Sequence, residues 1–164
     1  AGKTPGGNHM PAINAEMTES IHELGVANAS IPMDGLLCAG QLTVEQMDAL
    51  KALGFASFVS LRVATENGAG WEEVHAAQAG IDFQRLPVAG ADDIDESTAR
   101  TLAGMMAEAK RPMVLYCGSS NRVGALLALK AYHVDDVPAD DAVAFGRSAG
   151  LKGLEPKVRE ELGQ

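Results

Sequence analysis

Cysteine, aromatic residues, long apolar runs and positive charge are all scarce in this sequence. Two cysteines, Cys38 and Cys117, are too few for a disulfide framework, although one bridge between them is possible. No apolar run approaches the roughly 20 residues needed to cross a bilayer. The chain has 13 basic and 22 acidic residues, so its net charge is −9. This charge argues against general binding to nucleic acid or to an anionic membrane. An anionic substrate would therefore need a local site that attracts it.

The N-terminal segment differs in composition from the rest of the chain. Residues 1–20 are rich in glycine and proline and then polar, which predicts a mobile arm before a single domain over residues 21–164. The first ten residues contain neither the basic nor the apolar segment of an intact export signal. An alanine at position 1 is compatible with a signal already removed or with a vector junction. A periplasmic location is accordingly weighed slightly above a cytoplasmic one.

From Ile21 onward, short apolar segments alternate with amphipathic ones. Strands are predicted over 36–39, 55–61, 81–88 and 113–116, and helices over 43–53, 71–79, 97–109, 122–133, 140–148 and 155–162. Thr43 and Gln46 form a possible capping box that opens the 43–53 helix, and Gly54 would end it. In the 71–79 helix, Trp71, Val74 and Ala77 are expected on the inner face, and Val123, Leu126 and Leu127 form the core face of the 122–133 helix. This alternation predicts a three-layer α/β fold, in which helices flank a mainly parallel central sheet on both faces.

The segment Cys117-Gly-Ser-Ser-Asn-Arg122 lies between a predicted strand and a predicted helix. Ligands gather at the carboxyl ends of parallel strands, where loop N–H groups and the positive end of the next helix converge. Gly118 lets an anion approach the backbone, and Arg122 can grip a tetrahedral anion by two hydrogen bonds. The same field favours a thiolate at Cys117, the form of cysteine that attacks. Spacing alone also allows a small buried core cysteine and a surface arginine.

The sequence around this loop, YCGSSNRVGALLAL, resembles the signature of a bacterial phosphatase-like domain family named after beta-lactamase-hydrolase-like proteins. Other blocks agree in order: AGQLTVEQMDALKALGF, FVSLR followed by Glu66, a strand that ends in LPV, and FGRSAGLKGLEPKVREEL. The resemblance covers about residues 24–162. It implies a cysteine-phosphatase-like fold, that of the small dual-specificity tyrosine phosphatases.

The resemblance implies hydrolysis of a phosphate monoester through a phosphocysteine, on a phosphorylated or other oxyanionic substrate and without a cofactor or metal ion. Cys117 would be the nucleophile, and Arg122 would hold the phosphate oxygens. The loop residues that would assist in binding are Gly118, Ser119, Ser120 and Asn121. Arg62, at the end of a strand, would lie near the same rim and either contact substrate or form an ion pair with Glu66.

A carboxylic acid would protonate the leaving oxygen in this chemistry. The loop after Pro87-Val88 matches the region that supplies it, so the candidates are Asp92, Asp93 and Asp95. Asp95 could instead cap the helix that follows. Three of the four histidines, at positions 22, 75 and 133, have no spacing typical of metal ligands, and Cys38 is read as a buried structural cysteine.

Three features depart from the pattern of tyrosine and dual-specificity phosphatases. Four residues separate Cys117 from Arg122 instead of five, and four is the length seen in rhodaneses. Tyr116 replaces a histidine. Val123 replaces the hydroxyl residue that hydrogen-bonds the thiolate, a role that Ser119 or Ser120 could take. These departures predict weak generic phosphatase activity. They leave two alternatives, a rhodanese-like sulfurtransferase with a persulfide on the cysteine, and a non-catalytic module that binds an oxyanion or a protein.

Overall fold

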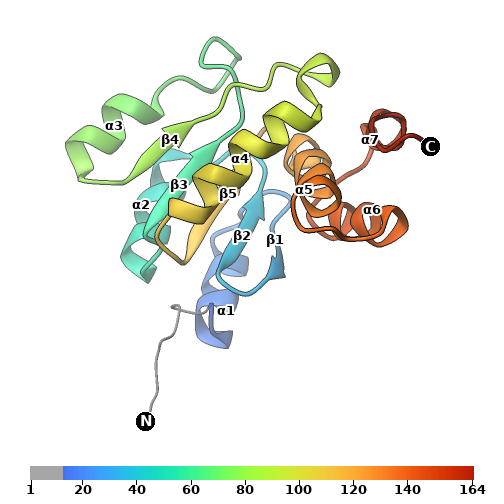
Figure 1. Ribbon diagram of the computed structural model, residues 1–164. Helices are drawn as coiled ribbons and strands as arrows, with labels where there is room; N and C mark the ends of the chain where they lie inside the picture. Colours follow the sequence, from blue (N-terminus) through green and yellow to red (C-terminus); the bar gives the residue numbers. More distant parts are fainter. Residues whose placement is uncertain (1–12) are drawn as a thin grey trace.

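A five-stranded sheet forms the centre of the computed structural model, which describes residues 13–164 (Figure 1). The strands are β1 (Ser30–Met33), β2 (Leu36–Ala39), β3 (Ser57–Ser60), β4 (Phe83–Arg85) and β5 (Met113–Tyr116), in the spatial order β1-β2-β5-β3-β4. Only β1, at one edge, is antiparallel to its neighbour, and the other pairings are parallel. The mainly parallel sheet predicted from the sequence is therefore confirmed.

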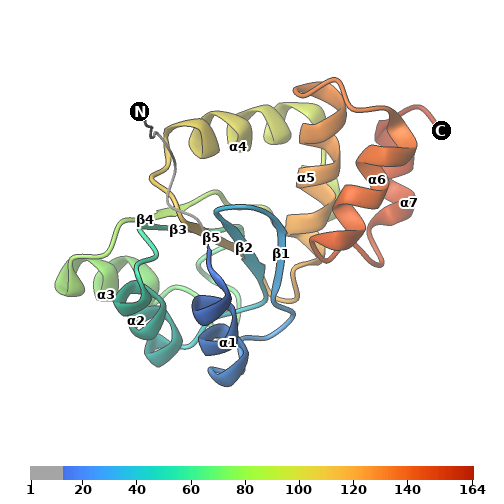
Figure 2. The same cartoon turned by 90° about the horizontal axis from the view of Figure 1, so that it is seen from below.

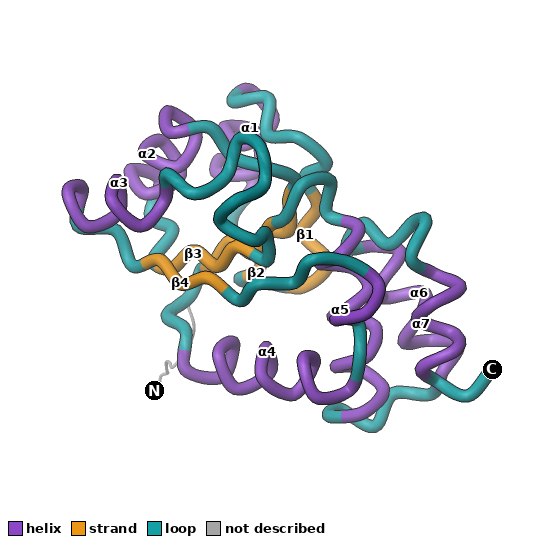
Figure 3. The backbone as a smooth tube through the Cα atoms, turned by 90° about the horizontal axis from the view of Figure 1, so that it is seen from above, coloured by secondary structure: helices purple, strands orange, loops and turns teal. Residues whose placement is uncertain are grey.

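Helices cover both faces of the sheet, as the alternating pattern predicts (Figures 2 and 3). On one face lie α1 (Ala15–Glu23), α2 (Val44–Leu53) and α3 (Glu72–Ala79). On the other lie α4 (Glu96–Glu108) and α5 (Asn121–His133), with α6 (Ala139–Ser148) and α7 (Glu155–Glu161) packed beyond α5. A short 3₁₀ turn, η1 (Ala91–Asp93), precedes α4. The three-layer architecture is confirmed.

The sheet separates two apolar clusters because successive strand residues point to opposite faces. On β5, Met113 and Leu115 pack on the side of α4 and α5, and Cys117 continues this set beyond the end of the strand. Val114 and Tyr116 pack on the side of α1 to α3. The two residues at the head of the loop, 116 and 117, therefore face opposite layers of the molecule.

The ends of α2 form as the sequence predicts. Thr43 and Gln46 make a reciprocal capping box, in which the Thr43 hydroxyl accepts from the Gln46 amide and the Gln46 side chain accepts from the Thr43 amide. Gly54 ends the helix with φ of 114°, in the left-handed region that favours glycine. Residues close together in sequence therefore set both ends of this helix.

The N-terminal boundary differs from the expected one. Residues 1–12 of the predicted arm lie outside the described residues, but α1 begins at Ala15 and its Ile21 is buried against the sheet. The boundary predicted at residue 20 therefore falls inside a helix, and the mobility of the arm stays a prediction. The missed signal was Asn14, which caps the helix by accepting a hydrogen bond from the amide of Met17. The short edge strand β1 was missed as well.

The face predicted for α3 is confirmed at Trp71, which packs against the apolar cluster on this side of the sheet, and is wrong at its other two positions. The Val74 residue is 65% exposed and Ala77 is exposed, whereas Glu72 and Ala76 are buried. Hydrophobic spacing failed here because a carboxylate with a full set of partners occupies the inner position. Among residues 13–164, no helix combines the length and apolar character needed to cross a membrane.

Candidate active site

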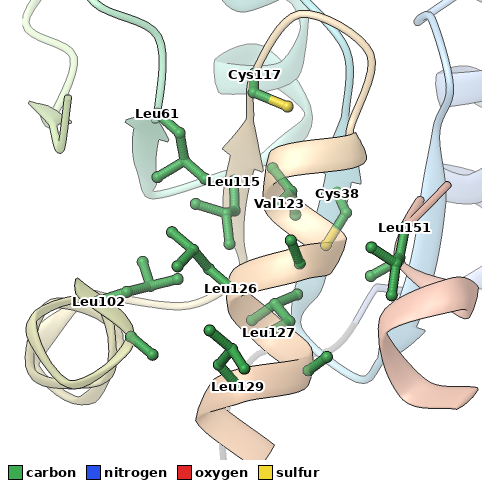
Figure 4. Close-up of a cluster of buried hydrophobic side chains, with 14 of the residues drawn as sticks. Cys38, Leu61, Leu102, Leu115, Cys117, Val123, Leu126, Leu127, Leu129 and Leu151 are labelled. Atoms are coloured by element: carbon green, nitrogen blue, oxygen red, sulfur yellow. The ribbon is translucent and has the colours of Figure 1, made fainter. Parts of the chain in front are cut away.

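Cys117 lies directly beyond the carboxyl end of β5, in the middle of the sheet. Its amide donates to the carbonyl of Ala39 at the end of β2 at 3.2 Å, and the amide of Leu61 beyond β3 donates to the carbonyl of Tyr116 at 2.8 Å. Both neighbouring strands thus hold the start of the loop. Figure 4 shows Cys117 at the end of the apolar cluster, beyond Leu115 and above Val123 at the start of α5. The residue is only 1% exposed.

The loop after Cys117 rests against the segment that follows β2. The amide of Gln41 donates to the carbonyl of Gly118 at 3.1 Å, and Gly40 forms an isolated β-bridge with Ser119. A Cβ atom at Gly40 would lie 2.7 Å from the Gly118 carbonyl oxygen, so this approach requires glycine. At its other end the loop turns through Ser120, whose φ of 68° lies in the left-handed region. The loop is therefore fixed at both ends.

Arg122 turns back over this loop, as the sequence predicts. Nη1 and Nη2 donate to the two carboxylate oxygens of Glu66 at 2.8 and 3.0 Å, and Nη1 also donates to the carbonyl of Val88 at 2.7 Å. Glu66, and after it Cys117, raises the pKa of the arginine, so the sulfur and the guanidinium are within electrostatic reach. A Cβ at Gly118 would lie 3.3 Å from Nη2. The guanidinium therefore lies against the loop backbone.

These contacts leave part of Arg122 available. A guanidinium carries five N–H groups, and three are used by Glu66 and Val88. The remaining two are on Nε and Nη2, which form one edge of the planar group. Two parallel N–H bonds from one edge are the arrangement that grips a carboxylate or phosphate. Arg122 can therefore bind an oxyanion while Glu66 holds it.

Glu66 is a site residue that the sequence suggested only as a partner of Arg62. Its carboxylate also accepts from Nε of Arg62 and from the amide of Val63, both at 2.9 Å. The hydrogen bond from Arg122, reinforced by those from Arg62 and Val63, outweighs burial and lowers the pKa of Glu66 to about 2. Glu66 is thus charged at any physiological pH. Of the two roles expected for Arg62, the ion pair with Glu66 is present, and contact with a substrate stays a prediction.

The loop that carries the candidate acids begins beside Arg122, because Val88 accepts from it. Asp95 caps α4 by accepting from the amide of Thr98 at 2.8 Å, and Asp93 accepts from the amide of Ala89 at 2.8 Å. Asp92 is exposed. Two of the three candidate carboxylates therefore have a structural hydrogen bond, and the structure leaves Asp92 as the accessible one.

Two of the four predicted binding residues use their side chains elsewhere. The buried Ser120 hydroxyl donates to the carbonyl of Ala149 at 2.6 Å, and its single hydrogen is thereby used. The Asn121 carbonyl oxygen accepts from the amide of Lys152 at 2.8 Å. The idea that Ser120 stabilises the thiolate is therefore wrong. Both side chains instead attach the loop to the segment between α6 and α7, whereas Gly118 and Ser119 stay exposed.

The second cysteine, Cys38, is a free thiol like Cys117. It is fully buried on β2, and burial, with a smaller effect from Cys117, raises the pKa of its thiol. Both sulfurs lie in the same apolar cluster, with Val123 between them in Figure 4. The buried structural role expected for Cys38 agrees with these observations. Among the described residues, no three His, Cys, Asp or Glu side chains are grouped as a metal site would require.

The sequence matches no protein-family model and is not significantly similar to any curated protein. Several solved structures share the fold. A candidate phosphatase of Neisseria meningitidis has 22% sequence identity, a TM-score of 0.66, and coverage of 80% of this chain and 94% of its own. A candidate phosphatase of Shewanella putrefaciens has 17% sequence identity and a TM-score of 0.64, and the match covers 87% of this chain and 97% of its own. P. aeruginosa TpbA, in its complex with pTyr, has 18% sequence identity and a TM-score of 0.57, and the match covers 81% of each chain. The chain therefore has the fold of the tyrosine and dual-specificity phosphatases.

Proposed function

We propose that this protein hydrolyses phosphate monoesters through a phosphocysteine formed on Cys117. The observation that carries the proposal is the position of Arg122. Glu66 holds one edge of its guanidinium, and the edge formed by Nε and Nη2 remains for a tetrahedral anion beside the sulfur. Preorganised donors of this kind stabilise the charge that a transferring phosphoryl group develops.

In the proposed first step, the Cys117 thiolate attacks phosphorus and the bond to the leaving oxygen breaks. Asp92, in its protonated form, gives its proton to that oxygen. In the second step, Asp92 as carboxylate takes a proton from water, the water oxygen attacks phosphorus, and the S–P bond breaks. Inorganic phosphate leaves, the thiolate is restored and Asp92 is protonated again. No oxidant, reductant or cofactor is needed for this cycle.

Several observations support this proposal. The fold is that of phosphatases, and one structure with that fold, TpbA, holds pTyr. The order of sequence blocks agrees with the beta-lactamase-hydrolase-like phosphatase family, to which we propose the chain belongs. The substrate is then a phosphorylated protein or small molecule, and the departures Tyr116 and Val123 favour low activity on generic substrates.

The spacing of the loop favours a second candidate function. Four residues between Cys117 and Arg122 match the rhodanese length, and a sulfurtransferase would carry a persulfide on the same cysteine. The Cys117 thiolate would attack the outer sulfur of thiosulfate, sulfite would leave, and cyanide would then take the outer sulfur of the persulfide as thiocyanate and restore the thiolate. The two chemistries use the same nucleophile and the same anion-binding arginine, so mutation of either residue does not separate them. The substrate does.

The test measures phosphate release from an aryl phosphate by fully reduced protein. The pH range is about 5–7, which lies below the ordinary pKa of a free thiol. We expect turnover that Cys117→Ser and Arg122→Ala abolish, and that Arg100→Ala, an exposed arginine on α4, leaves intact. No phosphate release, with a mass gain of one sulfur after thiosulfate and cyanide-dependent loss of it, would select sulfur transfer. Anion binding without either reaction would select a binding module.

A separate experiment assigns the acid. Aryl phosphates with good and poor leaving groups are compared in Asp92→Asn, Asp93→Asn and Asp95→Asn. Loss of a general acid costs about 10²–10⁴-fold, and the cost grows as the leaving group becomes more basic. We expect this dependence for Asp92→Asn alone. The same dependence in Asp93→Asn would transfer the role to Asp93.

A further inference from the structure

Behind the Cys117 loop, a continuous chain of polar side chains runs through the side of the molecule that carries α1 to α3. It begins at Tyr116, the residue before the nucleophile, and passes through Glu72, Gln41 and Arg62 to Glu66. From Glu66 it reaches Arg122. An uninterrupted path of hydrogen bonds thus joins Tyr116, the residue before Cys117, to the guanidinium of Arg122.

Glu72 is the buried anchor of this chain. Its residue exposure is 0%, and its two oxygens accept from Tyr116 at 2.9 Å, Gln41 at 3.1 Å, Arg85 at 2.8 Å and the amide of Gly70 at 3.0 Å. Burial raises the pKa of Glu72, but the hydrogen bonds from Arg85, Gln41 and Tyr116 outweigh it and lower the pKa. A buried carboxylate with every lone pair used is fixed in place.

Gln41 is the link between this anchor and the arginines. Its amide nitrogen donates to Glu72 and to the carbonyl of Leu42 at 2.8 Å, and its oxygen accepts from Nη1 of Arg62 at 2.9 Å. Its backbone amide also donates to the carbonyl of Gly118 within the loop. A side chain here must donate on one side and accept on the other, and an amide does both.

We propose that Gln41 is a positioning residue for the Cys117 loop, which orients Arg62 and through Glu66 the guanidinium of Arg122. The inference deepens the proposed function and rests on it. The charged groups that face Gln41 are Glu72 from α3 and Arg62 from the segment after β3. Arg85 from β4 and Tyr116 from β5 act on it through Glu72.

Two substitutions test this role. Gln41→Met keeps the length of the side chain and removes its three hydrogen bonds. Gln41→Glu keeps the shape but places an acceptor opposite Glu72 and the Leu42 carbonyl. When the introduced carboxyl is protonated it can donate to Glu72 and accept from Arg62, as the amide does. Glu72 and burial raise the pKa of that carboxyl, and Arg62 lowers it.

The readouts are kcat and KM for an aryl phosphate across pH, the affinity for inorganic phosphate, and unfolding in urea. We expect Gln41→Met to lower kcat by about ten- to a hundredfold at every pH, with a smaller change in KM, because misplacement of positioning groups acts mainly on the transition state. We expect Gln41→Glu to approach wild-type activity at low pH and to lose it as pH rises. Gln84→Met and Gln84→Glu, on the exposed side of β4, are the matched controls and should behave like the wild type.

Each outcome decides between the possibilities. Wild-type kinetics and phosphate affinity in both Gln41 variants would overturn the positioning role and leave the proposed function standing. The positioning role would also be overturned if both variants lost activity in proportion to their loss of stability and Gln41→Glu showed the same loss at every pH. A structural defect of that kind does not recover on protonation. If the wild type binds phosphate without turnover, the proposed function fails, and reduced phosphate affinity in Gln41→Met still supports the inference. A wild type that does not bind phosphate overturns both.

Discussion

The terminal nitrogens of Arg122 donate to both carboxylate oxygens of Glu66, at 2.8 and 3.0 Å. The pair joins the first turn of α5 to the loop after β3, across the end of the sheet where Cys117 lies. A bidentate pair fixes the plane of the guanidinium as well as its position. The Glu66 carboxylate therefore determines which edge of the Arg122 guanidinium remains available to bind an anion.

Removal of that carboxylate should weaken the site. We expect Glu66→Gln to lower kcat/KM for an aryl phosphate by about tenfold or more, since Arg122 loses its bidentate partner. The free energy of unfolding should fall by about 1–3 kcal/mol, because two partly buried arginines lose a counter-charge. Steady-state kinetics and urea unfolding measure both. Glu96→Gln, which removes an exposed partner of Arg100, should change neither, and wild-type kinetics in Glu66→Gln would contradict the assigned role.

The same pair predicts a pH dependence of stability. The pKa of Glu66 is about 2 in the folded protein, below the value of about 4.3 for an unperturbed glutamate. The stabilisation by the ionised group is therefore complete above about pH 5 and declines as pH falls toward 2. The difference in unfolding free energy between the wild type and Glu66→Gln should be constant from neutral pH to about 5 and shrink below it. A difference that already disappears near pH 6 would contradict this.

A glycine behind the loop should be indispensable. Gly150 has φ of 113°, and a Cβ there would lie 2.6 Å from Cβ of Ser120. We expect Gly150→Ala to lose activity. Its free energy of unfolding should fall by about 1–3 kcal/mol more than an unfavourable φ alone would cause, because Ser120 must also move. Gly54→Ala is the matched control, with φ of 114° and no atom within 4 Å of the added Cβ. Thermal unfolding and kinetics of the two variants should diverge, and equal behaviour would exclude a supporting role for this contact.

The two cysteines should differ in reactivity although both are buried, because only Cys117 lies within electrostatic reach of the Arg122 guanidinium. Burial raises the pKa of the Cys38 thiol, so it stays neutral and unreactive at neutral pH. We expect iodoacetamide to modify native protein once, at Cys117, and phosphate to slow the reaction. Peptide mass spectrometry identifies the modified residue, and denatured protein gives the control with both sites labelled. Modification of Cys38 at a comparable rate, or a disulfide between the two after mild oxidation, would contradict this assignment.

Local and periodic signals predicted most of the fold. The strand before Cys117, the capping box of α2 and the apolar face of α5 are set by residues close together in sequence, and each is found where expected. The misjudged inner face of α3 has a long-range cause. Glu72 looks like an ordinary exposed residue of a helix, and only its partners from β4, β5 and the segment after β2 make its burial possible.

The site shows the same division. Cys117 and Arg122 are close in sequence, so their spacing predicted that the arginine returns to the loop. The partners of the loop lie far away along the chain. Ser120 bonds a residue 29 positions later, and Glu66 is 56 positions before Arg122. No periodic pattern reports such contacts, which explains why the sequence leaves Ser120, beside Ser119, as a candidate partner of the sulfur and does not single out Gln41.

The most direct test of the account is to trap the intermediate. Reduced wild-type protein is mixed with an aryl phosphate, quenched rapidly in acid and digested, and the peptides are weighed. The account predicts one phosphoryl group on the peptide that carries Cys117, and none in Cys117→Ser. Phosphate release by the wild type without a phosphoryl group on that peptide, or with one on another residue, would contradict it.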